Sequence, residues 1–362
     1  MESQIEAIEA TTIESLPKAV LHEHLDGGLR VETVLDLADK VGYRDLPSYQ
    51  IDELRDWFHQ GRSGSLERYL EPFVHTVAVL QNEEAISRVA YESVEDLGAD
   101  GVVYAEIRFA PSLNIIGGLT RRAVLEAAHD GFTRASRDTG VMVAMIVCAM
   151  RQDTDSPDVA KAAVEAMDLG VVAFDLAGPE AGFPADDHIE ACRTVRRAGL
   201  GLTIHGGEGD GADSMWRALA LCGAQRIGHG VHVADDTNLA EGSMTNLGPF
   251  ATRVRDHQIP LEVAISSNLH TSAYPSAEEH PFGELYRNGF NVSINTDNRL
   301  MSGVSVSGEY ALAANTFGLN LLDLERTTVR AIEAGFGDYL ERRRLIDQVV
   351  TPAYALARGI QG

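Results

Sequence analysis

The sequence contains little of what would tie it to nucleic acid, to a membrane or to secretion. Of its 362 residues, 30 are Lys or Arg and 54 are Asp or Glu, which gives a net charge of −24 at pH 7. A protein of that charge is repelled by phosphate-rich polymers and anionic lipid, so we expect neither as a partner. No apolar run approaches the ~20 residues that cross a bilayer. The acidic N-terminal stretch lacks the basic and apolar regions of a secretory leader, and we expect a cytoplasmic protein.

Cysteine is also scarce. The three cysteines, Cys148, Cys192 and Cys222, lie far apart in the sequence and form no Cys-x-x-Cys pair. Because two of them also stand in apolar surroundings, we predict buried free thiols in a reducing compartment.

What the sequence does have is a regular alternation of strand-like and helix-like segments. Eight short segments rich in Val, Ile, Leu and Ala are predicted strands: Ala19–Asp26, Gly101–Pro111, Val141–Met150, Val171–Gly178, Leu200–Glu208, Ala224–His232, Ile259–Asn268 and Phe290–Asn298. Several are nearly continuous apolar runs, as expected of parallel strands covered by helices. Between these strands, apolar residues recur at helical intervals, as in Thr120–Thr139 and Asp187–Ala198. A glycine often ends the predicted helix just before the next strand: Gly98, Gly140, Gly170, Gly199 and Gly289. Eight such repeats predict an α/β fold, a (β/α)8 TIM barrel.

The connection after the first predicted strand is too long for a simple loop and helix. Between about residues 30 and 99 it holds four amphipathic stretches, which predict extra helices over the C-terminal mouth of the barrel: Val31–Val41, Ile51–Gln60, Leu66–Leu80 and Glu83–Leu97. The glycines of Gly61-Arg-Ser-Gly64 predict a flexible break. Five residues of this lid could line an apolar pocket or serve as ordinary packing: Phe58, Leu66, Tyr69, Leu70 and Phe73. With no repeat or interdomain linker, we predict a single domain over residues 1–362.

Two histidines stand one residue apart at the end of the first predicted strand. Because side chains alternate along a strand, His22 and His24 point the same way and can share one cation such as zinc. The pair alone fits solvated or core histidines equally well. Further ligands at other strand ends would decide between the two interpretations.

Other predicted strands also end in polar residues, and in a TIM barrel functional residues lie at the C-terminal strand ends. His205 and Asp297 end two of these strands, so His22, His24, His205 and Asp297 together predict a metal site. Glu208 follows two glycines and could act as a general acid or base, or could cap the next helix. His229, flanked by glycines, could orient an attacking water or shuttle its proton. We expect His232 to be hydrogen-bonded or exposed.

These motifs resemble the four signatures of the adenosine deaminase family of metal-dependent amidohydrolases. They occur in the family's order from Leu16 to about Gly335: His22-Glu-His24-Leu-Asp26-Gly, His205-Gly-Gly-Glu208-Gly, Gly-His229-Gly and Asn-Thr-Asp297-Asn. The resemblance also includes Leu-Pro-Lys before the first strand, Ser65-Leu-Glu-Arg-Tyr-Leu in the lid and Phe-Asp175-Leu-Ala-Gly178 at the fourth strand.

The resemblance implies a role for each motif residue. One zinc ion would be held by His22, His24, His205 and Asp297. Glu208 would protonate purine N1, and His229 would position the attacking hydroxide. In substrate binding, Gly178 would contact the base and Asp26 would accept a hydrogen bond from a ribose hydroxyl. The expected reaction is hydrolysis of adenosine and 2′-deoxyadenosine to inosine and 2′-deoxyinosine with release of ammonia.

The chain departs from the family pattern at two positions. Asn298 replaces a second Asp thought to bind purine N7, but an amide NH2 still donates to N7. His-Gly-Gly-Glu replaces the more frequent His-Ala-Gly-Glu, and no functional group is lost. The fourth strand has no Lys to bridge two metal ions, which favours a mononuclear site.

The alternatives concern the substrate and the activity itself. Because relatives that act on free adenine or on aminofutalosine-type nucleosides tend to carry another residue at the position of Asp26, Asp26 favours adenosine and 2′-deoxyadenosine as substrates. A nucleoside monophosphate would need a cationic pocket, and Arg62 and Arg68 on lid helices are typical of solvated residues. A non-catalytic nucleoside-binding barrel would be favoured by loss of a ligand or of Glu208, and all are present. The sequence leaves the oligomeric state open.

Overall fold

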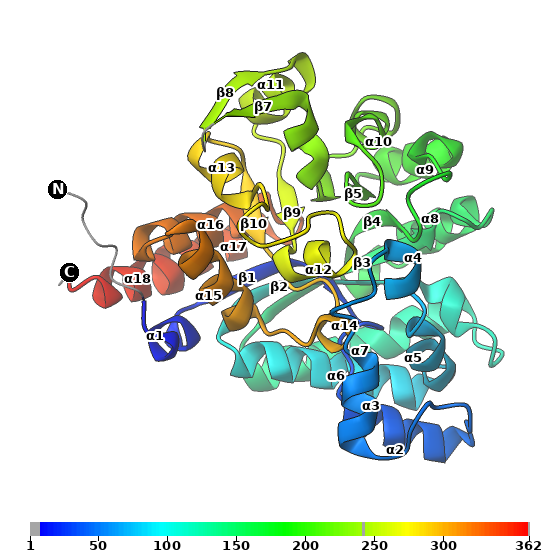
Figure 1. Ribbon diagram of the computed structural model, residues 1–362. Helices are drawn as coiled ribbons and strands as arrows, with labels where there is room; N and C mark the ends of the chain where they lie inside the picture. The colour runs from blue at the N-terminus through cyan, green and yellow to red at the C-terminus, as the bar shows by residue number, and fades with distance from the viewer. Residues whose placement is uncertain (1–7, 241–242, 361–362) are drawn as a thin grey trace.

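Eight parallel strands form a barrel at the centre of the molecule, with helices around it (Figure 1). The computed structural model describes residues 8–240 and 243–360; the acidic residues 1–7 lie outside it. Each strand pairs with the next in the order β1 (Lys18–His24), β2 (Val102–Phe109), β3 (Met142–Met150), β4 (Val171–Ala177), β5 (Gly201–Gly206), β6 (Arg226–His229), β9 (Leu261–Val263) and β10 (Val292–Ile294). The ring closes where the Asp297 N–H donates to the His22 carbonyl and the His24 N–H donates to the Asp297 carbonyl, both at 2.9 Å. The predicted TIM barrel is confirmed.

The helices begin and end where local sequence favours it. The helix α7 (Arg121–Thr139) starts at Thr120, whose hydroxyl accepts from the Ala123 N–H, and ends at Gly140 in the left-handed conformation. The other helices of the barrel layer and the C-terminal region are α1 (Ala10–Ser15), α8 (Ser156–Glu165), α9 (Ile189–Ala198), α10 (Ala212–Trp216), α11 (Pro249–Asp256), α12 (Ile265–His270), α13 (Phe282–Arg287), α14 (Arg299–Ser302), α15 (Val306–Phe317), α16 (Leu321–Ala334), α17 (Tyr339–Leu345) and α18 (Thr351–Ala357).

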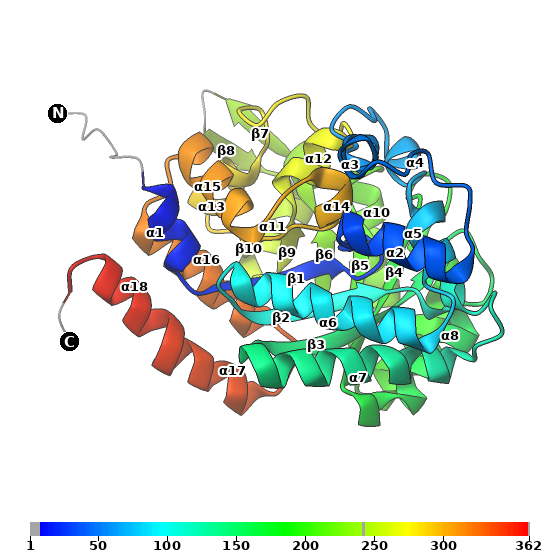
Figure 2. The ribbon, with the colours of Figure 1, turned by 90° about the horizontal axis from the view of Figure 1, so that it is seen from below.

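Five helices fill the long connection between β1 and β2: α2 (Val31–Val41), α3 (Ile51–Phe58), α4 (Leu66–Tyr69), α5 (Phe73–Val79) and α6 (Glu83–Ala99). The predicted stretch Leu66–Leu80 is two helices, because the chain turns at Leu70 and restarts after Pro72. The helices α3, α4, α12 and α14 lie together over one end of the barrel (Figures 1 and 2). One connected apolar core extends from Ile13 to Tyr354, which supports our proposal that residues 1–362 form one domain.

Several details differ from the prediction. The seventh barrel strand covers only Leu261–Val263, and residues 265–268 of the predicted strand Ile259–Asn268 lie in α12, whose Ser266 N–H donates to the Glu309 carboxylate of α15. The eighth covers only Val292–Ile294 of the predicted Phe290–Asn298. Gly98 lies inside α6, and Gly101, with φ of 78°, makes the turn instead. An unpredicted antiparallel hairpin of β7 (Thr237–Ala240) and β8 (Ser243–Leu247) follows β6 outside the barrel.

The structure also bears on the composition. Cys148, Cys192 and Cys222 are buried and free, as predicted. Among the described residues, every helix is too short or too polar to cross a membrane.

Candidate active site

Four predicted metal ligands meet at the C-terminal ends of the strands. His22 and His24 come from β1, His205 from β5, and Asp297 follows β10. The Asp297 Oδ1 atom lies 3.3 Å from His22 Nε2 and 3.4 Å from His24 Nε2. The Nε2 atoms of His24 and His205 are 3.3 Å apart. One atom from each of the four residues lies within 4.8 Å of the others, so the set could hold one ion.

The spacing of these atoms suits a zinc ion. Nitrogen ligands bind zinc at 2.0–2.1 Å, so two ligands at a tetrahedral angle are about 3.3 Å apart. The Nε2 atom of His22 is buried and has no hydrogen-bond partner among the described residues. A buried nitrogen of this kind needs a partner, and a cation at the centre of the cluster would supply one.

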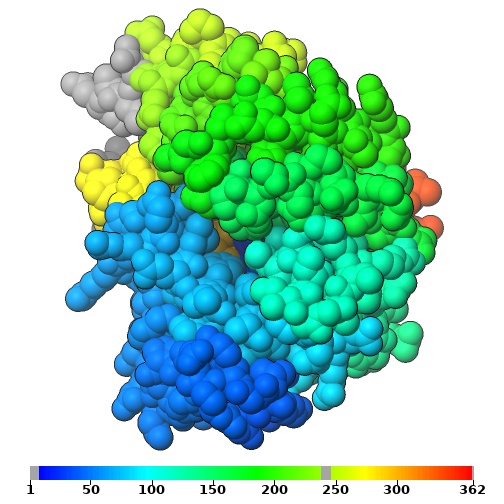
Figure 3. Space-filling view, turned by 90° about the vertical axis from the view of Figure 1, so that its right-hand side faces the viewer, coloured from blue at the N-terminus to red at the C-terminus, as the bar shows by residue number. Residues whose placement is uncertain are grey.

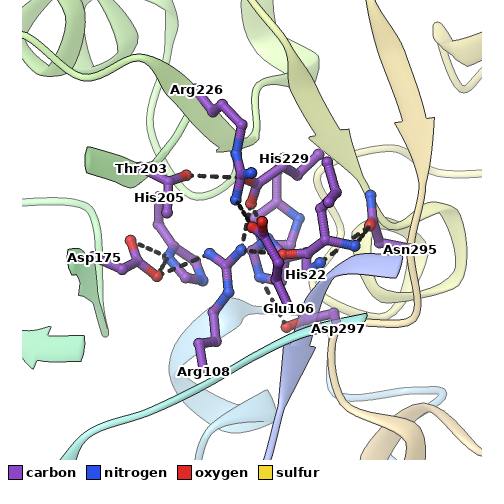
Figure 4. A network of polar contacts seen from close by, with 12 residues as sticks. His22, Glu106, Arg108, Asp175, Thr203, His205, Arg226, His229, Asn295 and Asp297 are labelled. Atoms are coloured by element: carbon purple, nitrogen blue, oxygen red, sulfur yellow. Dashed lines mark hydrogen bonds and ion pairs between the residues drawn. The ribbon is translucent and has the colours of Figure 1, made fainter. Parts of the chain in front are cut away.

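Buried carboxylates stand behind two of the histidines (Figure 4). Glu262 on β9 lies 3.0 Å from His22 Nδ1, and Asp175 on β4 lies 3.0 Å from His205 Nδ1. Because a carboxylate accepts, each imidazole keeps its proton on Nδ1 and turns the Nε2 lone pair to the cluster. In the sequence, Asp175 was recognised only as part of a family motif, and the role of Glu262 behind His22 was not predicted.

Two buried arginines hold these carboxylates in place. Arg108 donates to Asp175 at 2.9 Å and to Glu262 at 2.6 Å. Arg226 donates to Glu262 at 2.7 Å and pairs with Glu106 at 2.6 Å. The guanidinium groups form ion pairs with carboxylates that would otherwise be costly to bury, and so fix their positions beneath the cluster.

The loop that carries Glu208 is held by another buried carboxylate, that of Glu180. Glu180, just after β4, accepts from four successive backbone N–H groups, those of Gly207, Glu208, Gly209 and Asp210, at 2.6 to 3.2 Å. Gly207 has φ of 68°, which lets the loop turn its amides toward that carboxylate. Glu208 is therefore held by its backbone, and its carboxyl is buried at the cluster. Glu180 was not predicted, because only the loop conformation creates its site.

His229 ends β6 and faces both the cluster and Glu208. Its Nε2 atom lies 3.4 Å from Glu208 Oε2. His229 and Asp297 both adopt left-handed backbone, with φ of 61° and 59°. Such conformations are costly for residues other than glycine and concentrate at functional sites. His232, predicted to be hydrogen-bonded or exposed, lies 2.9 Å from Asp235.

A cavity of about 360 Å³ opens onto these groups. It lies between the blue lid segment and the cyan and green segments, where a hollow is visible (Figure 3). Its lining includes Asp26, Gly178, Asn298 and the lid residues Leu66, Tyr69, Leu70 and Phe73. Phe58 is buried in the core instead. At Gly178, with φ of 95°, a Cβ atom would come within 2.4 Å of Gln152, so a side chain there would disturb the wall.

Burial shapes the protonation of two carboxyl groups in the cavity. Burial, with the nearby charges of Asp297 and Glu180, raises the pKa of Glu208 well above its ordinary value. Burial, with the charge of Asp297, raises the pKa of Asp26 to about 7. Buried carboxyl groups with such shifts are frequent in active sites.

The fold and the cluster define the class: a TIM barrel whose mouth can hold one metal ion beside a buried carboxyl group. The adenosine deaminase family model matches residues 17–352. The adenosine deaminase of Mycobacterium marinum is 49% identical over 353 residues, which cover 96% of this chain and 98% of the relative. The chain belongs to the adenosine deaminase family and is a hydrolytic deaminase. The predicted family and enzyme class are confirmed.

Solved structures show the same barrel. The Arabidopsis ADAL protein complexed with IMP is 26% identical, with a TM-score of 0.81, and the match covers 94% of this chain and 99% of that chain. A zinc-bound amidohydrolase from Burkholderia ambifaria is 24% identical, with a TM-score of 0.83 and coverage of 99% and 97%; this likeness concerns the fold.

Proposed function

We propose that the protein hydrolyses adenosine and 2′-deoxyadenosine to inosine and 2′-deoxyinosine, with release of ammonia. The observation that carries the proposal is the His and Asp cluster beside Glu208 at the inner end of the cavity. Membership of the adenosine deaminase family supports it. The cavity falls within the ~300–1,000 Å³ typical of small-molecule sites.

The metal proposed is one zinc ion per chain, held by His22, His24, His205 and Asp297. When bound, zinc lowers the pKa of a water molecule toward ~7 and so supplies hydroxide at neutral pH. The chain's own contribution is the orientation of the ligands. Glu262 and Asp175 fix the His22 and His205 rings, and Ser267 Oγ donates to Asp297 Oδ2 at 2.6 Å.

Glu208 and His229 are the proposed catalytic residues. Glu208, whose pKa burial raises, would donate a proton to purine N1, which relieves the negative charge that develops on the ring when C6 is attacked. His229 faces the same point and would orient the attacking oxygen toward C6. The proton of the new C6 hydroxyl group would then pass to the NH2 group, the C6–N bond would break, and ammonia would leave the 6-oxopurine product.

Three residues of the cavity wall would bind the substrate. Asp26 would accept a hydrogen bond from a ribose hydroxyl, Gly178 would contact the base, and the Asn298 amide would donate to purine N7. The buried Asp26 Oδ1 atom has no hydrogen-bond partner within the described residues, so it is available to accept from a ligand hydroxyl.

Charge at the cavity entrance favours a nucleoside over a nucleotide. Glu67 and Glu71 are exposed residues that line the cavity. Arg62 and Arg68 are also exposed but do not line it. Two carboxylates at the entrance would repel a phosphate group. Adenine and an aminofutalosine-type nucleoside remain the alternative substrates. We also propose a cytoplasmic location, supported by the three buried free thiols.

Ammonia release tests the proposal directly. Purified zinc-loaded protein is given adenosine, 2′-deoxyadenosine, adenine, AMP and an aminofutalosine-type nucleoside in parallel. We expect fast turnover of the first two, lost on chelation and restored by zinc. Turnover of another member would keep the chemistry and change the substrate. No turnover of any member, with zinc bound, would favour a non-catalytic nucleoside-binding barrel.

Asp26→Ala tests the substrate assignment separately. Because free adenine has no ribose hydroxyl, we expect kcat/KM for adenosine to fall about 10-fold, the cost of losing one hydrogen bond, while any activity on adenine is unchanged. Asp187→Ala, outside the cavity lining, is the matched control. Equal losses on both substrates would show that Asp26 acts through the β1 strand end instead.

A further inference from the structure

A chain of three hydrogen bonds runs from the backbone behind the mouth to the ring of His229. The Phe282 N–H donates to His280 Nδ1 at 3.2 Å. His280 Nε2 lies 3.3 Å from Asn268 Oδ1, and Asn268 Nδ2 lies 3.0 Å from His229 Nδ1. Phe282 opens α13 and Asn268 belongs to α12, so these hydrogen bonds connect two helices outside the barrel strands to His229.

The direction of each bond follows from the first one. A backbone N–H can only donate, so His280 Nδ1 must be an acceptor without a proton. The proton of the neutral His280 ring is then on Nε2, which donates to the Asn268 carbonyl oxygen. With its oxygen used in this way, Asn268 presents its NH2 group to His229 and donates to Nδ1. The remaining proton of a neutral His229 ring is therefore on Nε2.

Burial keeps this chain neutral. Asn268 is fully buried, and His229 and His280 are 1% and 3% exposed. His280 packs against Tyr274 and Phe317, with ring centroids 5.2 and 6.3 Å away. Burial lowers the pKa of His280 to about 3, so its ring carries one proton at neutral pH. A doubly protonated ring would oppose the Phe282 N–H.

We propose that Asn268 and His280 are positioning residues that fix the His229 proton on Nε2. This atom lies 3.4 Å from Glu208 Oε2 and has no hydrogen-bond partner among the described residues. His229 thus presents a hydrogen-bond donor to the mouth. Its neutral ring has no free lone pair there with which to accept a proton.

The consequence for the reaction rests on the proposed function. As a donor, His229 would hold the attacking oxygen by one of its lone pairs and leave another for C6. A general base would need the opposite tautomer, with the lone pair of Nε2 facing the mouth. The hydrogen-bond chain therefore selects orientation, and not proton removal, as the task of His229.

The tautomer can be measured without turnover. In zinc-loaded protein with ¹⁵N-labelled histidine, long-range ¹H–¹⁵N correlation spectra of the imidazole rings report which nitrogen carries the proton. The His229 signal is assigned by its loss in His229→Gln. We expect protons on Nε2 of both His229 and His280. A proton on Nδ1 of His229 would overturn the proposal, whether or not the protein deaminates adenosine.

Asn268→Asp tests the proposal by reversing one bond. A carboxylate only accepts, so the His229 Nδ1 atom should take up a proton and the spectrum should change accordingly. We expect kcat for adenosine to fall about 10–100-fold with KM within about threefold of wild type, the usual range for residues behind a metal site. An unchanged His229 signal in a folded Asn268→Asp protein would contradict the chain.

A pair of substitutions at His280 separates the hydrogen bond from packing. His280→Gln places an amide NH2 near the position of Nε2–H, so the bond to Asn268 can persist. His280→Leu fills similar space and removes the donor. We expect kcat within about threefold of wild type for Gln and about 10-fold lower for Leu, with equal zinc content. Equal losses in both variants would assign His280 to packing alone.

Discussion

The floor and the side wall of the barrel mouth hold their histidines by opposite kinds of hydrogen bond. In the floor, made of strand residues, carboxylates accept from Nδ1 of His22 and His205. In the wall, made of α12, an amide donates to Nδ1 of His229. The first arrangement leaves a lone pair on Nε2, and the second leaves a proton there.

The difference shows that the partner behind a ring, rather than the ring itself, decides what a histidine can do. Three imidazole groups lie with their centroids 4.5 to 5.5 Å apart around one point. Two of them offer lone pairs suited to a cation, and the third offers a proton suited to an oxygen. The charged floor also needs Arg108 and Arg226 to balance it, whereas the wall is neutral.

The largest expected effect separates proton donation from metal binding. Glu208→Gln should keep the fold and the zinc content, because the residue lies beside the proposed ligands and its backbone stays clamped by Glu180. We expect kcat to fall on the order of 10²–10⁴-fold, the usual contribution of a positioned acid or base. Steady-state kinetics with zinc analysis provides the check. A near-normal kcat would remove Glu208 from the chemistry.

Asp175→Asn places an amide behind His205, as Asn268 does behind His229. An amide can donate to His205 Nδ1 and place the ring proton on Nε2, against the cation. We expect zinc affinity to fall about 10–100-fold, measured by competition with a chelator. Asp168→Asn, at an exposed ion pair with Arg122, is the control and should leave affinity unchanged. Equal affinities for both variants would mean that the floor carboxylate does not tune the ligand.

Glu180→Gln tests the loop that joins the floor to Glu208. The amide loses the charge that attracts four N–H groups and turns an NH2 toward some of them. We expect faster hydrogen exchange at 207–210 and a loss of about 1–3 kcal/mol in the free energy of unfolding. Glu190→Gln, exposed on α9, is the control. Slow exchange at these amides in the variant would show that the loop holds itself.

The smallest expected effect is the pH dependence of the free energy of unfolding that arises from the buried, neutral His280. The pKa of His280 is about 3 in the folded protein and about 6.5 when unfolded, so below pH 6.5 only the unfolded chain takes up this proton. Its contribution to stability is full above pH 6.5 and declines as the pH falls toward 3. Between pH 7.5 and 5.5 we expect wild type to lose roughly 1.4 kcal/mol more than His280→Gln. Parallel urea titrations measure the difference, and parallel losses would contradict it.

The fold could be predicted because the parallel barrel strands have short apolar sequences that end in polar residues. The same pattern predicted the four proposed metal ligands, since each comes at the end of such a sequence: His22, His24, His205 and Asp297. The error at Ile259–Asn268 has a tertiary cause. Ile265 continues the apolar pattern of the strand, but Glu309, more than 40 residues away along the chain, binds the N-terminus of α12.

The partners of the site could not be predicted, because they depend on closure of the barrel. Glu262 contacts His22 across 240 positions of sequence, and Asn268 contacts His229 across 39. Glu180 has a role only because the turn at Gly207 directs four backbone N–H groups toward its carboxylate. In a single sequence, nothing distinguishes Glu262, Asn268 or Glu180 from any other charged or polar residue.

The closure of the ring at Asp297 also orders events during synthesis. His22 and His24 lie in the first strand to leave the ribosome, and Asp297 follows the last barrel strand. The four proposed ligands are complete only after residue 297 has emerged and joined β1. A nascent chain would therefore offer a cation two histidines, then three, and the full set only when the barrel closes. A metal held by the proposed ligands would be bound late in synthesis.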